Sequence, residues 1–206
     1  MSYFDGYEQV VDPWLTGHAG QFGLLLKFNM FDLKISGSMN RIIIPLLLMI
    51  VLPALNVHAQ QKSIETNIAD IRAAFKKINS LSLKQEQFRY ESEGCVEDGI
   101  IQYYFQDNEI VKIIEFGSIG DGSWKNEYYY ESGKFIFSYE MLVGSSAEGE
   151  ETKSEYRVYA KDGAVIRYME DQKILPSDSR VTKTLAIAGK LLKAYTTKKF
   201  AAVLCE

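Results

Sequence analysis

The sequence predicts an α+β fold: an N-terminal helix, an antiparallel β-meander of about seven strands, and a C-terminal helix packed on one face of the sheet. Near both ends of residues 60–206, apolar residues recur with the period of an α-helix. Between those ends the residues alternate with a period of two, and two-residue turn signals interrupt the alternation. A sheet with one apolar face has to be covered, and the two helices are available to cover it.

The first helix is expected over 63–79. Apolar residues recur there at spacings of 4, 3, 4 and 3, which places them on one face: Ile64, Ile68, Ile71, Phe75 and Ile78. We expect Ser63 as the N-cap, because its hydroxyl can accept a backbone hydrogen bond, and Asn79 as the C-terminal stop.

Three two-residue turns organise the predicted sheet: Asp107-Asn108, Ser132-Gly133 and Asp162-Gly163. These residue types tolerate positive φ and therefore close tight hairpins of the primed type. The segments around them form an internal repeat that reads QYYFQDNEIVK, EYYYESGKFIF and RVYAKDGAVIR. In each, an aromatic-rich strand enters the turn and a β-branched or aromatic strand leaves it, so we expect a meander of related hairpins.

The middle hairpin can be paired residue by residue. Its turn pairs Glu131 with Lys134, and strict alternation then predicts one apolar face made of Trp124, Asn126, Tyr128, Tyr130, Phe135, Phe137, Tyr139 and Met141. The same procedure places Lys112 among Ile110, Ile114 and Phe116 on the apolar face of the first hairpin. It places Arg167 with Val165 and Met169 on that of the third.

The second helix is expected from about 181 to 195. Its apolar residues again recur at spacings of 4, 3, 4 and 3, namely Val181, Leu185, Ala188, Leu192 and Tyr195. The preceding residues Pro176, Ser177, Asp178 and Ser179 are a start signal, and Lys198 and Lys199 suit the negative end of the helix.

Residues 39–59 have the three-part layout of a secretory signal peptide. Arg41 provides the basic region, residues 42–55 form an uninterrupted apolar run, and Val57-His58-Ala59 is a small-x-small cleavage pattern. The run is shorter than the ~20 residues that a membrane span needs, so we expect cleavage before Gln60 and no stable membrane span afterwards. An uncleaved anchor is the alternative.

Residues 1–38 are then an upstream extension, assigned because of an early start codon or present as a cytoplasmic leader. Residues 60–206 form a single exported domain, periplasmic or extracellular.

The composition of residues 60–206 excludes several functions. They contain 20 Lys and Arg against 23 Asp and Glu, a net charge of −3 without a basic block, which argues against nucleic-acid binding. The two histidines, His18 and His58, precede the predicted cleavage site. The mature chain therefore lacks the base of a Ser-His-Asp triad and the imidazole ligands of a zinc site. We expect no enzyme, no metal and no cofactor.

Both cysteines, Cys95 and Cys205, follow the cleavage site. In an oxidising compartment they are candidates for a disulfide that ties the C-terminus to the start of the sheet. The alternative is two unpaired thiols.

The candidate binding residues lie on the predicted aromatic face: Trp124, Tyr128, Tyr130, Phe137 and Tyr139. Tyrosines offer a flat apolar surface with a hydroxyl at its edge, which suits a protein, a glycan or an apolar ligand. The alternative is that these rings form the core. Lys112 and Arg167 are candidates to contact an anionic ligand or a bound carboxylate. The alternative is that each lies near a sheet edge or extends its alkyl stem along the face. Glu127 and Glu155 recur at equivalent hairpin positions and are the candidate pair for a carboxylate-based hydrolase, or exposed charges.

Two resemblances add to this interpretation. The strands with YYF..DN and YYY..SG and the tract HAQQ resemble small secreted or lipoprotein-like domains of unknown function from Gram-negative bacteria. The segment IADIRAAFKKINSLSLKQEQFRY resembles the opening helix and strand of periplasmic lipoprotein-carrier proteins. Neither resemblance transfers the role of a particular residue.

The first hypothesis is an exported, non-catalytic binding or interaction domain. The second is a periplasmic carrier of an apolar or lipid-like ligand on the aromatic face, and the third is a hydrolase.

Overall fold

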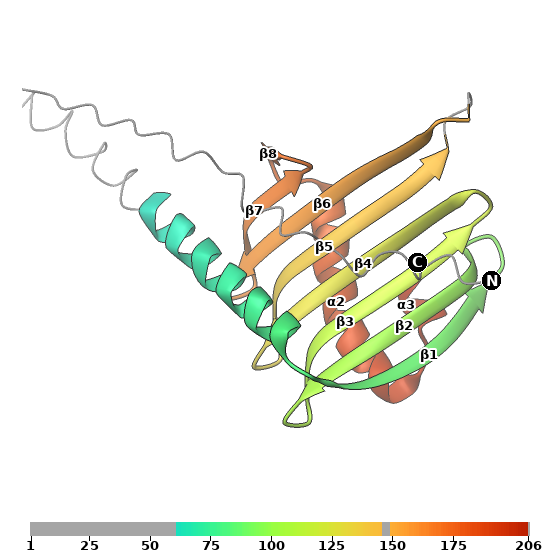
Figure 1. The fold of residues 1–206 in the computed structure, drawn as a ribbon, viewed down its shortest axis with the longest axis horizontal. Coiled ribbons are helices and arrows are strands. Elements are labelled where there is room, and N and C mark those ends of the chain that lie inside the picture. Colours follow the sequence, from blue (N-terminus) through green and yellow to red (C-terminus); the bar gives the residue numbers. More distant parts are fainter. Residues whose placement is uncertain (1–60, 146–148, 206) are drawn as a thin grey trace, which may run out of the picture. The chain divides into compact units, whose positions relative to one another are not determined.

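The structure, a computed structural model, describes residues 61–145 and 149–205. Helix α1 spans residues 61–80. An eight-stranded antiparallel sheet with strand order β1 to β8 follows it (Figure 1). The strands are β1 Lys84–Ser92, β2 Val96–Gln106, β3 Glu109–Ile119, β4 Gly122–Glu131, β5 Lys134–Ser145, β6 Glu151–Lys161, β7 Ala164–Glu170 and β8 Lys173–Leu175. Helices α2 (Ser179–Thr197) and α3 (Ala201–Leu204) close the chain. The α+β meander predicted from the sequence is confirmed, with the short β8 as an eighth strand.

The described residues lie within one compact unit. The predicted signal peptide at 39–59 and the upstream extension at 1–38 lie outside the described residues. Within the described ranges, no helix combines the length and the hydrophobicity needed to cross a bilayer. Because α1 already includes residues 61 and 62, the prediction of Ser63 as its N-cap is wrong.

All three predicted hairpin turns are present, and each has positive φ at both central residues. The values are 50° and 67° at Asp107-Asn108, 49° and 71° at Ser132-Gly133, and 51° and 81° at Asp162-Gly163. This left-handed geometry matches the twist of the flanking strands, and Asp, Asn, Ser and Gly tolerate it at low cost. The internal repeat therefore corresponds to three hairpins of one design.

Each of these hairpins also contains a β-bulge that the sequence did not reveal. Tyr130 pairs with Phe135, but the preceding Tyr129 pairs with Phe137, so Ile136 is an extra residue. Val111 and Ile166 occupy the equivalent positions in the other two hairpins. A bulge shifts the register by one and turns every later side chain to the opposite face.

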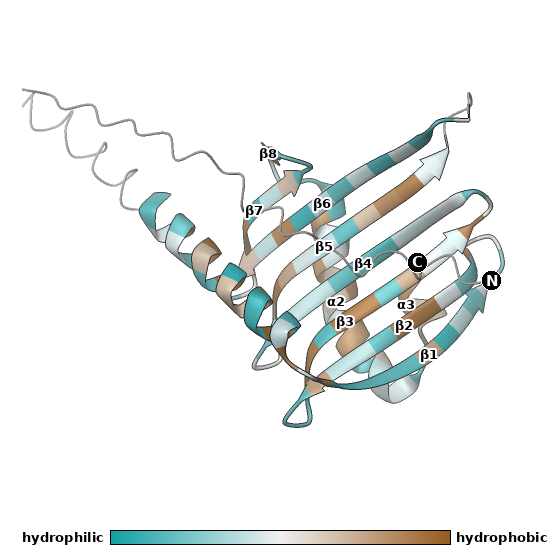
Figure 2. Cartoon of the chain, viewed as in Figure 1, coloured by the Kyte–Doolittle hydropathy of each residue, from teal (hydrophilic) through white to brown (hydrophobic). Residues whose placement is uncertain are grey.

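The single apolar face predicted for the middle hairpin is therefore wrong. Trp124, Asn126, Tyr128, Tyr130 and Phe135 lie on the face that α2 covers, whereas Phe137, Tyr139 and Met141 lie on the face that α1 covers. The same correction moves Lys112, Ile114 and Phe116, and Arg167 and Met169, to the α1 face. Hydrophilic and hydrophobic residues are interspersed along the long strands of the sheet (Figure 2).

The α2 face holds the main core. Tyr103 and Tyr130 are buried there and donate their hydroxyls to the backbone of α2, at 3.0 Å to the carbonyl of Leu191 and at 2.9 Å to that of Ala188. The helix begins after Asp178, whose carboxylate accepts the backbone N–H groups of Arg180 and Val181. The buried residues of α2 are Val181, Ala188, Leu191 and Ala194, so the buried stripe lies one position away from the predicted Leu192 and Tyr195.

The α1 face is closed by Phe75, whose ring centroid lies 4.9 Å from that of Tyr129 and 5.5 Å from that of Phe137. Ile68, Ile71 and Ile78 are buried beside it, as the apolar stripe predicts. On the other face, a disulfide joins Cys95 to Cys205 with the Sγ atoms 2.05 Å apart. It fastens α3 to the hairpin of β1 and β2 and confirms the predicted pairing.

Candidate ligand-binding site

A pocket of about 660 Å³ lies between the sheet and the N-terminal half of α2. It is open to solvent at one side. Residues of β3, β4 and β5 line it on the side of the sheet, and residues of α2 line it on the other side. Cys95 of the disulfide and Leu204 of α3 also contribute. The lining residues are Tyr90, Cys95, Glu115, Trp124, Asn126, Tyr128, Ser138, Tyr139, Glu140, Leu142, Asp178, Ser179, Arg180, Lys183, Thr184, Ile187 and Leu204.

Glu115 is the organising residue of this pocket. Its side chain is 1% exposed and accepts three hydrogen bonds. Oε1 accepts the hydroxyl of Tyr90 and, at 2.7 Å, the indole Nε1–H of Trp124. Oε2 accepts the Nδ2–H of Asn126 at 2.7 Å. Three side chains from β1 and β4 are thus fixed around one carboxyl on β3.

Two glycines allow the aromatic donors to approach the sheet. A Cβ on Gly117 would lie 2.2 Å from Cζ2 of Trp124, and a Cβ on Gly99 would lie 2.4 Å from Cε1 of Tyr90. Each glycine is the direct cross-strand neighbour of its aromatic residue. The rings therefore lie against bare backbone, an arrangement that any larger residue would prevent.

The electrostatics of Glu115 are those of a charge without a counterion. Burial raises the pKa of its carboxyl, and the three hydrogen bonds only partly oppose this effect. The ion pairs found among the described residues do not include Glu115. Burial, and then the charge of Glu115, raises the pKa of Tyr90 far above its ordinary value, so this hydroxyl stays protonated as a donor.

Charged residues of α2 form the rim of the pocket. Arg180 donates to Glu140 at 2.9 Å, and its guanidinium lies 3.9 Å from the ring centroid of Tyr156. Asp178 is occupied as the N-cap. Lys183 is exposed on the next turn of the rim.

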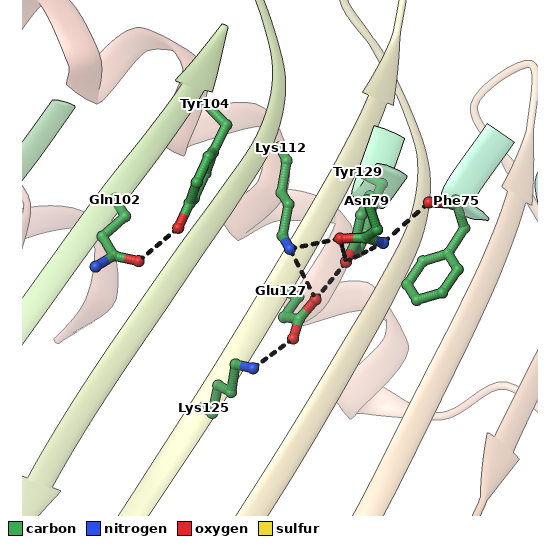
Figure 3. Close-up of polar contacts among 8 residues, drawn as sticks. All are labelled: Phe75, Asn79, Gln102, Tyr104, Lys112, Lys125, Glu127 and Tyr129. Carbon is green, nitrogen blue, oxygen red and sulfur yellow. Dashed lines mark hydrogen bonds and ion pairs between the residues drawn. The ribbon is translucent and has the colours of Figure 1, made fainter. Parts of the chain in front are cut away.

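A second polar cluster lies on the opposite face, beneath the end of α1 (Figure 3). Glu127, 6% exposed, binds Lys125 at 2.8 Å, lies 3.6 Å from Nζ of Lys112 and accepts the hydroxyl of Tyr129. Lys112 also donates to Oδ1 of Asn79 at 2.7 Å, and Asn79 in turn donates to the hydroxyl of Tyr129.

Each charged side chain of this cluster has a partner of opposite charge within the chain, although two lysines share one glutamate and the net charge is +1. Burial alone would raise the pKa of Glu127, but the charges of Lys112 and Lys125 outweigh it, and the pKa is lowered. Burial lowers the pKa of Lys112, while Glu127 opposes that effect. The cluster attaches α1 to the sheet through Asn79.

The structure separates the candidate residues chosen from the sequence. Trp124 and Tyr128 line the pocket, and Tyr130 lies in the core beneath α2. Phe137 packs under α1. Tyr139 is among the residues that line the pocket, but its ring lies on the α1 face, 5.4 Å from the guanidinium of Arg157.

The two pattern-breaking cations have partners inside the chain. Lys112 binds Asn79 and Glu127, so it neither lies at a sheet edge nor extends to solvent. Arg167 forms an ion pair with Glu65 of α1 through two hydrogen bonds. Its Nη2 donates to Oε1, and its Nη1 donates to Oε2 at 3.4 Å. Both cations hold α1 on the sheet.

The carboxylates singled out for hydrolysis are also paired. Glu127 is buried rather than exposed and is bound by two lysines. Glu155 binds Lys153 at 2.9 Å and Arg157. Burial would raise the pKa of Glu155, but these partners lower it, so neither residue has the raised pKa of a general acid.

Sequence reasoning missed Glu115, Tyr90 and Asn126. A signal was present in the two strand glycines, Gly99 and Gly117, because glycine inside a strand often marks a close approach by another group. The described residues contain no group of three or more His, Cys, Asp or Glu side chains that could hold a metal ion. Comparison of the chain with protein-family models, with curated proteins and with solved structures finds no match.

Proposed function

We propose that residues 60–206 form an exported, non-catalytic domain that binds a small molecule in the pocket between the sheet and α2. The observation that carries the proposal is the buried carboxyl of Glu115, which fixes Trp124, Tyr90 and Asn126 around one end of an open cavity. A merely structural interface would gain more from apolar residues there, because burying a charge without a counterion costs several kcal/mol, about as much as a large core truncation.

The dimensions and lining of the pocket support a small ligand. Its volume of about 660 Å³ falls in the range of small-molecule sites, ~300–1,000 Å³. Ring faces and the apolar residues Leu142, Ile187 and Leu204 alternate with a few fixed polar groups. Such a lining suits a molecule with an apolar body and a polar end.

The arrangement of Glu115 argues against hydrolysis. A general acid needs a proton directed at the substrate, whereas both oxygens of Glu115 act as acceptors for donors of the chain itself. The second carboxylate of the pocket, Glu140, is bound by Arg180. We therefore assign Glu115 to positioning and binding.

A carrier of an apolar ligand is the second candidate, favoured by the presence of a cavity between the sheet and a helix. Tyr128 lines this cavity, as the carrier hypothesis requires, but the side chain of Phe137 lies on the opposite face. The polar end of the pocket favours a compact amphiphile over a bare hydrocarbon chain.

Two observations support export. The pattern at 39–59 is typical of a signal peptide. The disulfide between Cys95 and Cys205 is of a kind that persists in oxidising compartments. The intact mass of the exported protein tests this part of the proposal, since a chain beginning at Gln60 supports cleavage and one that retains residues 42–55 contradicts it.

The binding proposal is tested by an NMR survey of the full chain with small fragments of four kinds: amines, carboxylates, sugars and aliphatic alcohols. Saturable shifts confined to pocket residues support the proposal for whichever class binds. The control is Thr184→Trp, which fills the cavity from α2 and should abolish those shifts. Shifts that are unchanged in this variant, or that lie outside the pocket for all four classes, would contradict the proposal.

A further inference from the structure

We infer that the ligand of this pocket carries a positive charge, an amine or a quaternary ammonium group, which lies against the ring of Trp124 within reach of the Glu115 carboxylate. This inference rests on the proposed function and specifies the chemical class of its ligand.

The first step is the charge balance of the pocket. Glu115 is the almost fully buried carboxyl of the lining, and it forms no ion pair with a described residue. The cations of the rim do not pair with it. Arg180 is bound to Glu140 and packs on Tyr156, and Lys183 is exposed at the rim, where water screens its charge. A cationic ligand would supply the missing counter-charge in a region where water screens it poorly.

The second step is the hydrogen-bonding capacity that remains. Oε2 of Glu115 accepts only one donor, and the buried Oδ1 of Asn126 has no hydrogen-bond partner in the described part of the chain. With the carboxyl of Glu115 ionised, the amide of Asn126 keeps this orientation, because its Nδ2 donates to Oε2. The groups left over at this end are acceptors, so the complementary ligand brings donors or positive charge.

The third step is the aromatic lining. Trp124, Tyr128 and Tyr90 all line the pocket around Glu115. A cation over an aromatic face is attracted by the negative charge of the ring face, and tryptophan is the best such surface. The hydrogen bond from Nε1 to Glu115 holds the indole in place, and the carboxylate makes the ring environment more negative. An anionic ligand would meet Glu115 as a like charge. A neutral polyol would leave the charge unbalanced.

The test uses choline and its carbon isostere, in which a tert-butyl group replaces the trimethylammonium group. The two molecules have the same shape and differ in charge. The chain has two tryptophans, Trp14 and Trp124. In the full chain with Trp14→Phe, fluorescence therefore reports Trp124 alone. We expect saturable quenching by choline at millimolar concentration, with an affinity at least about tenfold above that of the isostere.

Three variants complete the test. Glu115→Gln should lower the affinity for choline about tenfold, to that of the isostere, because the amide keeps the size of the side chain and removes its charge. Lys193→Gln, exposed on α2 and outside the lining of the pocket, should leave choline binding unchanged. Lys183→Gln removes a positive charge from the rim, so it should not weaken choline binding and would weaken an anion. Acetate serves as the anionic probe.

Equal affinities of choline and its isostere would overturn the inference, as would the absence of choline binding or binding of acetate that Lys183→Gln abolishes. These outcomes are distinguishable from failure of the proposed function. If the pocket binds neutral or anionic fragments in the NMR survey but not choline, the binding proposal stands and the cationic ligand is excluded.

Discussion

The indole of Trp124 lies over Gly117, its cross-strand neighbour, so closely that a Cβ on Gly117 would come within 2.2 Å of Cζ2. The same indole donates to Glu115, two residues before Gly117 on β3, at 2.7 Å. One short stretch of β3 therefore sets both the height and the orientation of this ring. The account of the pocket depends on this arrangement.

Gly117→Ala should displace the indole. Because the added methyl group meets ring atoms held by a buried hydrogen bond, we expect a loss of about 1–3 kcal/mol in the free energy of unfolding, typical of overpacking. The fluorescence of Trp124 should also change. Gly144→Ala, also in a strand, is the matched control, since its Cβ meets only Oγ1 of Thr152 at 3.8 Å. Urea denaturation measures the loss of stability in both variants. Equal losses would contradict the proposed contact between Gly117 and the indole.

The stability of the protein should depend on the titration of Glu115. The pKa of its carboxyl is raised above the ordinary value of 4.5, so the folded protein holds the proton more tightly than the unfolded chain. This contribution to stability is complete below pH 4.5 and is lost as the pH rises through the raised pKa.

Glu115→Gln cannot titrate and should not show this loss. We therefore expect the free energy of unfolding of the wild type to fall relative to that of the variant as the pH rises from 4.5 through the raised pKa of Glu115. Denaturation curves at a series of pH values measure the difference. If the free energy of unfolding of the wild type rose relative to that of the variant with rising pH, the prediction would be contradicted.

Glu127→Gln should be strongly destabilising. It leaves Lys112 and Lys125 without their carboxylate, and both lysine side chains are less than one fifth exposed. Breaking a buried ion pair by removing one partner costs about 3–5 kcal/mol. Asp98→Asn, which removes the exposed pair with Arg89, is the control and should cost less than about 1 kcal/mol. Similar losses in the two variants would show that the cluster beneath α1 does not hold the helix.

Removing the disulfide should also destabilise the domain. Cys95 and Cys205 are 110 residues apart, and a loop of that length is worth up to ~4–5 kcal/mol in the chain-entropy model. The double variant Cys95→Ser with Cys205→Ser should unfold at lower urea concentration, and reductant should have the same effect on the wild type. No change in the reductant experiment would mean that the bond does not contribute to stability.

Ser132→Asn should stabilise the domain. Ser132 has φ of 49°, a left-handed conformation that Asn adopts more readily, and the substitution creates the Asn-Gly pair favoured in this type of turn. We expect a gain of about 0.5 kcal/mol. Ser145→Asn, exposed at the end of β5 without positive φ, should be neutral. Thermal denaturation of both variants provides the comparison, and a loss of stability in Ser132→Asn would show that the turn does not prefer Asn.

The fold was accessible from the sequence because periodicity and turn chemistry are local properties. The stripe from Ile68 to Ile78 and the turn at Ser132-Gly133 each identify an element without knowledge of its neighbours. Residues near a turn were also paired correctly, as with Tyr130 and Phe135.

The sequence did not reveal which residues of each strand lie on which face of the sheet. Ile136 looks like any strand residue, but as a bulge it places Phe137 opposite Tyr129 and turns the rest of β5 over. For the same reason Lys112 and Arg167 looked like charges on an apolar face, when their partners on α1 lie far away in sequence. The pocket was missed because Glu115 acquires its role only when β1 and β4 bring Tyr90 and Trp124 to it.

The most direct measurement of the central claim is the NMR shift of the Trp124 indole N–H during titration of the full chain with choline. We predict that this signal moves saturably, together with amides of α2 around Thr184, and that Glu115→Gln needs about tenfold more choline for the same shift. Shifts centred instead on Asn79 and Lys112, beneath α1, would place the ligand on the other face of the sheet and contradict the account.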